Sequence, residues 1–293
     1  MHATRPIRRR ALGVAGFTVP AGAALIAMLL AATLLASCLD PSGVRPTVAA
    51  APVPVIAPRT GGPAVLFQDT FTRPDGLVTN EFAMWNPSSS LAVVSPDWEM
   101  TSGSLFARNG LGWSGVPDGV SPDARSASHT DSAVFRLTTR RADFTNVRVA
   151  FDLRMLRLVT TPRTPPVDWD GVHVFLRYQS EYSLYYASVD RRDGTVAIKK
   201  KVPGGSTNGG TYSTLATGRH AWPSGRWEHV TASVVTNRDG SVTIELRAGG
   251  ALLARATDDG RVGGPPIRAA GKTGIRGDNA EFEVDAFTVT PAT

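Results

Sequence analysis

The sequence predicts an all-β domain over residues 65–293, built as an antiparallel two-sheet jelly-roll sandwich. Apolar and polar residues alternate along several of its segments, which is the pattern of half-buried strands. Asp-Gly pairs separate two pairs of these segments, and this is a strong hairpin signal. Because no useful length of helical periodicity interrupts the pattern, we expect two packed sheets of short strands.

Strand signals begin at residues 65–67 and continue to the C-terminus. The further expected strands are residues 147–155, 171–178, 183–190, 195–202, 229–236, 241–247 and 281–290. Asp193-Gly194 and Asp239-Gly240 are expected to close two hairpins, and Gly249-Gly250 a third.

A basic and then apolar leader precedes this domain. Three arginines at residues 8–10 are followed by residues 11–36, which carry no charge, as in an export signal. The segment ends Leu35-Ala36-Ser37-Cys38, which resembles the lipobox of bacterial lipoproteins. The resemblance implies that residues 1–37 are a signal peptide and that Cys38 is lipidated. The alternative is an uncleaved transmembrane helix, and both alternatives place the rest of the chain outside the cytoplasm.

Residues 38–64 predict an extended linker, because they are rich in proline and alanine and have no apolar periodicity. The chain would then be membrane-anchored through its lipid.

The net charge of +6 comes largely from the leader: four of the 31 basic residues lie in residues 1–37, which leaves 27 bases against 25 acids. We therefore expect no nucleic-acid partner. Cys38 is the single cysteine, which excludes an internal disulfide, and no feature indicates an oligomeric state.

Five segments of the expected domain carry a family resemblance. They are residues 67–71, 97–105, 142–149, 222–230 and 272–289. In this order and spacing they resemble the concanavalin A-like lectin/glucanase superfamily, especially its laminin-G-like and bacterial 3-keto-disaccharide hydrolase-like domains. The resemblance implies a jelly roll with a hairpin at residues 97–105, and it specifies the fold better than the function.

One face of the expected strand 171–178 carries polar and aromatic side chains. With neighbouring strands and the loop before it, this face gives the expected carbohydrate-binding residues Trp169, His173, Arg177, Gln179, Tyr186 and Lys199. The resemblance implies that such a concave face binds glycans, since aromatic rings stack on sugars and guanidinium and amide groups bind hydroxyls or carboxylates. Lysines favour an acidic polysaccharide. The alternative is an ordinary solvated sheet face.

Catalysis is the second alternative for this face. The resemblance to polysaccharide lyases on this fold implies proton transfer by His173 and Tyr186, with Arg177 and Gln179 neutralising a substrate carboxylate. A glycoside-cleaving enzyme needs two carboxylates that flank the bond, and the acidic residues 281–285 lack the required spacing. We expect a carbohydrate-binding module without catalysis. A laminin-G-like structural or protein-binding module is a third alternative.

A cation site is expected where the first and last strands meet. Asp69 lies on the first strand and Asp285 on the last, and Asp278 and Asn279 are further candidate ligands. The resemblance implies structural calcium, which needs six or more oxygen ligands. The alternative is that these side chains cap strand ends through hydrogen bonds to the backbone.

Overall fold

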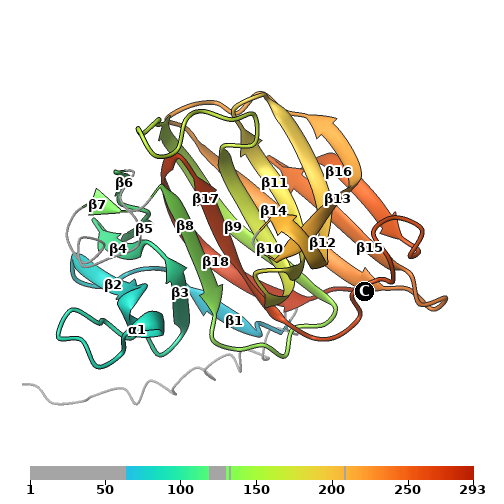
Figure 1. Ribbon diagram of the computed structural model, residues 1–293, viewed down its shortest axis with the longest axis horizontal. Coiled ribbons are helices and arrows are strands. Elements are labelled where there is room, and N and C mark those ends of the chain that lie inside the picture. Colours follow the sequence, from blue (N-terminus) through green and yellow to red (C-terminus); the bar gives the residue numbers. More distant parts are fainter. Residues whose placement is uncertain (1–63, 119–129, 132, 208) are drawn as a thin grey trace, which may run out of the picture. The chain divides into compact units, whose positions relative to one another are not determined.

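Two antiparallel sheets pack face to face around an apolar core (Figure 1). The computed structural model describes residues 64–118, 130, 131, 133–207 and 209–293, all within the compact unit Pro58–Thr293. The expected signal peptide and Cys38 lie outside the described residues, as does the linker apart from Ala64. In the described part of the chain no helix has the length and apolar character needed to cross a membrane.

The larger sheet contains nine strands of the described chain in the order β16-β15-β14-β9-β18-β5-β4-β2, with β1 paired to β18. Its strands are β1 (Phe67–Asp69), β2 (Gly76–Asn80), β4 (Ser104–Arg108), β5 (Leu111–Trp113), β9 (Val147–Leu158), β14 (Trp227–Thr236), β15 (Val242–Ala248), β16 (Ala251–Asp258) and β18 (Ala280–Pro291).

The smaller sheet contains seven described strands in the order β13-β12-β11-β10-β17-β8-β3, so β13 forms one edge. Its strands are β3 (Trp98–Ser102), β8 (Val134–Thr139), β10 (Gly171–Ser180), β11 (Ser183–Arg191), β12 (Thr195–Thr207), β13 (Gly210–Arg219) and β17 (Lys272–Asp278). A short parallel pair, β6 (Val116–Pro117) and β7 (Thr130–Asp131), and one helical turn, α1 (Phe82–Trp85), complete the described elements.

The predicted fold class is confirmed, and the three expected hairpins form as β11–β12, β14–β15 and β15–β16. Gly194 and Gly240 have φ values of +68° and +84°, which explains why glycine follows aspartate in both turns. The hairpin expected at residues 97–105 is wrong. β3 pairs with β8 in the smaller sheet, whereas β4 pairs with β2 and β5 in the larger one. The chain crosses between the sheets at Gly103, whose φ is +83°.

An aromatic cluster anchors the core where the first and last strands meet. Trp98 is fully buried, and its ring lies 5.1 Å from Phe67 and 5.0 Å from Phe287, centroid to centroid. β1 pairs directly with β18 beside this cluster. Burying a large apolar side chain of this kind stabilises the fold by about 1.5–3 kcal/mol.

A bulge in β10 changes which side chains face outward. Val172, Val174 and Leu176 point into the core, as the alternation predicts. Arg177 then adopts a φ of +47°, and the pairing of β10 with β17 shifts register between Phe175 and Tyr178. A bulged residue interrupts the two-residue period, so the positions after it no longer follow the expected faces.

Lys200 fixes the register of β12 from inside the sandwich. Its side chain is fully buried, and its Nζ lies 2.9 Å from Oδ1 of Asp258 and 2.5 Å from the carbonyl oxygen of Gly264. Tyr185 donates a hydrogen bond of 2.7 Å to the other oxygen of Asp258. A buried charge that loses its partner costs about 3–5 kcal/mol, so this position strongly resists a slip of the strand.

Candidate functional site

A cavity opens on the outer face of the smaller sheet, which is the face turned away from the core. Its volume is about 240 Å³, and it is lined by Trp169, Tyr186, Lys199, Lys201, Thr207, Tyr212 and Arg276. We call this cavity the aromatic pocket. The pairing of β11, β12 and β13 creates it, because Tyr186 lies opposite Lys199 and Lys201 lies opposite Tyr212.

Aromatic rings form the walls of the aromatic pocket. The rings of Tyr186 and Tyr212 lie 5.7 Å apart, centroid to centroid. Trp169, from the loop before β10, keeps 50% of its surface exposed. An exposed indole beside two phenol rings offers flat apolar surfaces together with polar atoms at their edges.

A buried polar group lies beneath these rings. His173 has no exposed surface; its Nδ1 lies 3.2 Å from Oγ of Ser188, and its Nε2 lies 3.2 Å from Oδ2 of Asp278. Arg276 donates two hydrogen bonds, of 2.6 and 2.7 Å, to the same aspartate. Burial lowers the pKa of His173, so its imidazole is neutral at pH 7. Burial alone would raise the pKa of Asp278, but Arg276 holds it well below the ordinary value.

Two lysines bring positive charge to the aromatic pocket. Lys201 donates a hydrogen bond of 2.6 Å to the carbonyl oxygen of Glu181, and its Nζ lies 4.9 Å from the centre of the Tyr212 ring. Burial lowers the pKa of Lys201 to about 8. Burial also lowers the pKa of Lys199, which is half-buried. Lys201 is only 2% exposed and Lys199 is half-buried, so both groups are desolvated, which strengthens their attraction to an anion.

The structure brings together three of the six expected binding residues. Trp169, Tyr186 and Lys199 line the aromatic pocket. His173 lies on the same face, because it pairs with Ser188 and Arg276, but its predicted exposure is wrong. The ring of Tyr186 packs against the ring of His173 at 4.5 Å, centroid to centroid, and this packing hides His173 from solvent.

The predicted positions of Arg177 and Gln179 on this face are wrong, and the bulge is the physical reason. Arg177 is 1% exposed and donates to the carbonyl oxygens of Thr145 and Ile267 at 3.1 and 2.7 Å. Gln179 donates to the backbone of Ala270 at 2.6 Å. Tyr178, which the pattern assigned to the inner face, instead joins Phe175 and Tyr186 in a small outer cluster.

The expected binding residues did not include four further members of the pocket, which are Lys201, Thr207, Tyr212 and Arg276. Lys201 follows Lys199 by two residues on an expected strand, so the alternation alone already placed them on one face. Tyr212 lies on β13, a strand that was not predicted because threonine, serine and glycine dilute its alternation. No signal in the sequence indicated that β13 lies beside β12 at the sheet edge.

The quartet expected for a lyase is not assembled. Tyr186 contacts His173 through ring packing, and His173 is fully buried. Burial raises the pKa of Tyr186 well above its ordinary value, which opposes a role as a base. Arg177 binds backbone and side-chain oxygens elsewhere in the domain.

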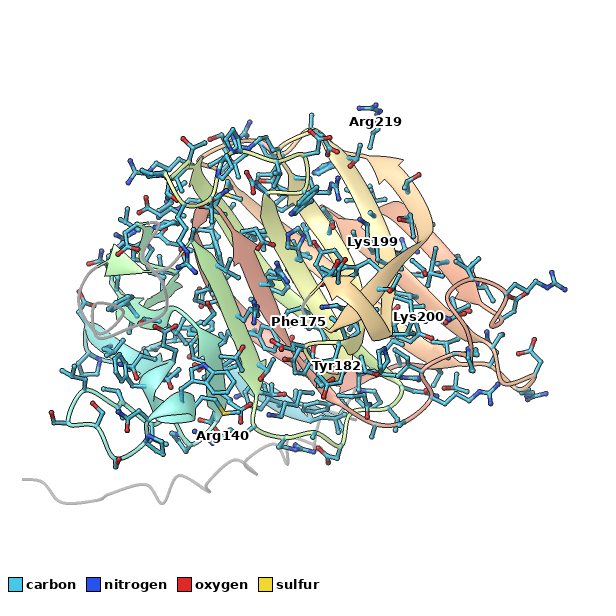
Figure 2. The ribbon with its side chains drawn as sticks, in the orientation of Figure 1. Arg140, Phe175, Tyr182, Lys199, Lys200 and Arg219 are labelled. Carbon is cyan, nitrogen blue, oxygen red and sulfur yellow. The ribbon has the colours of Figure 1, made fainter. Side chains whose placement is uncertain are left out.

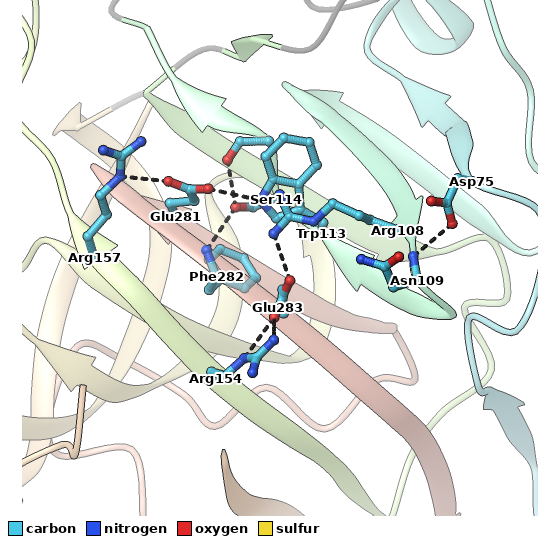
Figure 3. A network of polar contacts seen from close by, with 11 residues as sticks. Asp75, Arg108, Asn109, Trp113, Ser114, Arg154, Arg157, Glu281, Phe282 and Glu283 are labelled. Carbon is cyan, nitrogen blue, oxygen red and sulfur yellow. Dashed lines mark hydrogen bonds and ion pairs between the residues drawn. The ribbon is translucent and has the colours of Figure 1, made fainter. Parts of the chain in front are cut away.

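Glu281 and Glu283 both form ion pairs (Figure 3). Glu281 accepts hydrogen bonds from Arg157 at 2.7 Å and from the indole of Trp113 at 3.2 Å. Glu283 accepts from Arg108 at 2.6 Å and from Arg154 at 2.8 Å. Both carboxylates lie on the larger sheet, away from the aromatic pocket, and both are nearly buried. Ion-paired acids of this kind stabilise the pairing of strands rather than flank a substrate bond.

The acids proposed for calcium do not form a joint site. β1 and β18 are neighbours as expected, but Asp69 binds Arg73 and accepts a 2.7 Å hydrogen bond from the Trp98 indole. Asp278 lies in the other sheet and is bound by Arg276. Asp285 accepts a hydrogen bond from the backbone of Ala286. In the described part of the chain no three metal-ligating side chains converge, so this donor set does not fit calcium.

Comparisons with known proteins support the fold. No family model matches the chain, and neither does any curated protein sequence. Among solved structures, one from work on endo-acting O-glycanases of the human gut microbiota that initiate mucin breakdown matches with 9% identity and a TM-score of 0.50, over 78% of this chain and 100% of that one.

Two further solved structures are similar at lower TM-scores. A Bacillus subtilis protein of unknown function with a galectin-like fold has 11% identity and a TM-score of 0.46, over 78% of this chain and 96% of its own. The carbohydrate recognition domain of Emp46p in its potassium-bound form has 7% identity and a TM-score of 0.47, over 78% and 100%. At such identities the likeness concerns the fold alone. The described domain of this chain is an antiparallel two-sheet β-sandwich, and its likeness to these structures extends to the fold.

Proposed function

We propose that this protein binds carbohydrate at the aromatic pocket without transforming it, and that the bound sugar carries an acidic group. One observation carries the proposal: a half-exposed tryptophan and two tyrosines surround a cavity of about 240 Å³ that also receives Lys199, Lys201 and Arg276. Flat rings bind the apolar faces of sugars, and the neighbouring cations bind a carboxylate or sulfate.

The size of the cavity favours a single sugar unit within a longer chain. Drug-sized ligands occupy pockets of about 300–1,000 Å³, and the aromatic pocket is smaller than that range. A glycan would place one acidic unit in the pocket and continue across the open sheet. The absence of catalysis in this proposal rests on the buried position of His173 and on the ion pairs of Glu281 and Glu283.

We also propose that a lipid on Cys38 holds the domain at the extracytoplasmic side of a membrane, with residues 38–64 as a spacer. The segment Leu35-Ala36-Ser37-Cys38 supports this location. In the native host, Cys38→Ser should prevent labelling with radioactive palmitate and release the protein from the membrane fraction. Continued labelling of the Cys38→Ser protein would exclude this anchor.

Retention of the full-length chain on a panel of neutral and acidic polysaccharides tests the binding function. We expect retention on acidic polysaccharides, without new ultraviolet absorbance from unsaturated uronates and without new reducing ends. Chelation of calcium should leave retention unchanged, because the candidate calcium ligands have other partners. New absorbance would instead identify a lyase, and retention on no glycan would favour a protein-binding module.

Two tryptophans provide a matched comparison for this experiment. Trp169→Ala should weaken retention about tenfold, because loss of one stacked aromatic contact costs about 1–1.5 kcal/mol. Trp85 is 62% exposed and donates to the carbonyl oxygen of Thr101, away from the aromatic pocket. Trp85→Ala should therefore bind like the unaltered protein. Equal loss in both variants would mean that the effect comes from general destabilisation rather than from the pocket.

A further inference from the structure

A second cavity lies beside the aromatic pocket on the same outer face. Its volume is about 440 Å³, and it is lined by Arg191, Thr195, Ala197, Lys199, Thr214, Thr217, Gly218 and Arg219. We call it the arginine pocket. Lys199 lines both cavities, so they are adjacent along β12 and β13.

The register of β12 and β13 sets the direction in which the two pockets follow one another. The cross-strand pairs run in the order Lys201–Tyr212, Lys199–Thr214, Ala197–Thr217 and Thr195–Arg219. At about 3.3 Å per residue, the path from Lys201 to Thr195 spans about 20 Å. Figure 2 shows Lys199 midway along these strands and Arg219 near one end.

Among the described residues, cations that form no ion pair gather on this side of the sheet. On β8 and β17 the outward cations are compensated: Arg136 pairs with Glu181 at 3.2 Å, and Lys272 pairs with Glu99 at 2.5 Å. Arg276 is likewise bound by Asp278.

The cations of β12 and β13 differ from these. Within the described residues, neither Lys199 nor Arg219 forms an ion pair, whereas Arg191, at the same end of the arginine pocket, is bound by Asp193 at 2.8 Å. Lys201 donates a hydrogen bond to the backbone carbonyl of Glu181, and its Nζ lies 4.9 Å from the centre of the Tyr212 ring. The cations without an ion-pair partner among the described residues therefore follow β12 and β13.

From this arrangement we infer that the arginine pocket is a second subsite, and that the ligand is a polyanionic glycan lying along β12 and β13. The inference rests on the proposed function, since the aromatic pocket would hold one acidic unit of the same chain. Lys199 would contact the ligand between the two subsites. Threonine side chains at positions 195, 214 and 217 line the second subsite and supply hydroxyl groups suited to sugar hydroxyls.

Two linked subsites predict a dependence on chain length. A ligand that fills only the aromatic pocket gains nothing from Arg219, whereas a longer one brings its second acidic unit to the arginine pocket at a high effective concentration. Because Arg219 is exposed, salt should weaken its contribution more than that of the partly desolvated Lys199.

Size-defined oligosaccharides test this inference on the full-length protein. Dissociation constants would be measured by calorimetry for dimers and hexamers of galacturonate, which carry carboxylates, and of heparin, which also carry sulfates. Arg219→Ala should weaken hexamer binding about fivefold, the upper range for one exposed ion pair, and leave dimer binding unchanged. Arg148 is an exposed cation on β9 of the other sheet, so Arg148→Ala removes the same charge as a control.

The outcomes separate this inference from the proposed function. If Arg219→Ala binds hexamers like the unaltered protein while Trp169→Ala binds them weakly, the aromatic pocket acts alone and the second subsite is wrong. If Arg219→Ala weakens dimers and hexamers equally, Arg219 acts only through the general field of the protein, which also contradicts the inference. If the unaltered protein binds neither glycan, the proposed function fails and the second subsite fails with it. Binding of heparin hexamers alone would assign sulfate as the recognised group.

Discussion

Replacement of Arg177 separates a structural role for this side chain from a ligand-binding role. Its guanidinium donates to the carbonyl oxygens of Thr145 and Ile267 and to the side chains of Asn146 and Thr236, at 2.7–3.1 Å. Arg177→Ala would leave these buried oxygens without their donor. Each buried oxygen left without a partner lowers the free energy of unfolding by about 1–3 kcal/mol, and the loss of several takes away a large part of the stability of an ordinary domain.

A companion variant isolates the backbone contribution at the same position. Arg177 has a φ of +47°, a conformation that costs an ordinary residue about 1–2 kcal/mol and glycine almost nothing. Arg177→Gly should therefore lose about 1 kcal/mol less stability than Arg177→Ala. Urea unfolding followed by tryptophan fluorescence measures both changes.

Glycan affinity, measured below the unfolding transition, provides the decisive comparison. Because Arg177 is 1% exposed and lies outside the aromatic pocket, each folded molecule of either variant should bind acidic glycans normally. A normal unfolding midpoint combined with lost affinity would refute this reasoning. It would mean that Arg177 reaches the ligand, as the uninterrupted alternation of β10 predicts.

Two further predictions concern pH. Burial raises the pKa of Asp190 to about 7, so its ionisation opposes folding increasingly as pH rises from about 4 to 7. Asp190→Asn should therefore be more stable than the unaltered protein at pH 8.5, by up to about 4 kcal/mol, and equally stable near pH 3.5. Thermal unfolding at the two pH values measures both differences. Burial lowers the pKa of Lys201 to about 8, so affinity for an acidic glycan should fall between pH 7 and 9, and Lys201→Arg should flatten that fall. An unchanged affinity profile in Lys201→Arg would mean that the lysine does not act on the ligand.

The fold was predictable because most strands keep a strict two-residue period. β9 is an example: Val147, Val149, Phe151, Leu153 and Met155 are all buried, and the residues between them are partly or fully exposed. Side chains of a regular strand must alternate, so such a pattern specifies both the strand and its inner face.

The binding face was only partly predictable, because it depends on where this period is interrupted. Trp169, Tyr186 and Lys199 reach the pocket since they precede the bulge or lie on other strands. Arg177 lies at the interruption and Gln179 follows it, and the alternation of a single sequence cannot locate a bulge. Gly271 lies so close to Arg177 that a Cβ would approach its backbone carbon to 2.6 Å, which shows how tightly that partner segment packs there.

Contacts between distant segments were also beyond the reach of the sequence. Asp69 and Asp278 were grouped as candidate ligands, yet they belong to different sheets and have different partners. Tyr186 lies on β11 and Tyr212 on β13, with the whole of β12 between them in the sequence. The pairing of β12 with both β11 and β13 brings the two rings together.

The three consecutive lysines of β12 divide two tasks between alternate positions. Lys199 and Lys201 face the aromatic pocket, whereas Lys200 holds Asp258 inside the sandwich. Substitution of Lys199, which is half-buried, can therefore change ligand preference while the fold tolerates it, but substitution of Lys200 leaves a buried aspartate without its partner. Single-residue changes on the outer face of β12 can therefore alter binding specificity between relatives, because Lys200 and Asp258 keep the register of the strand unchanged.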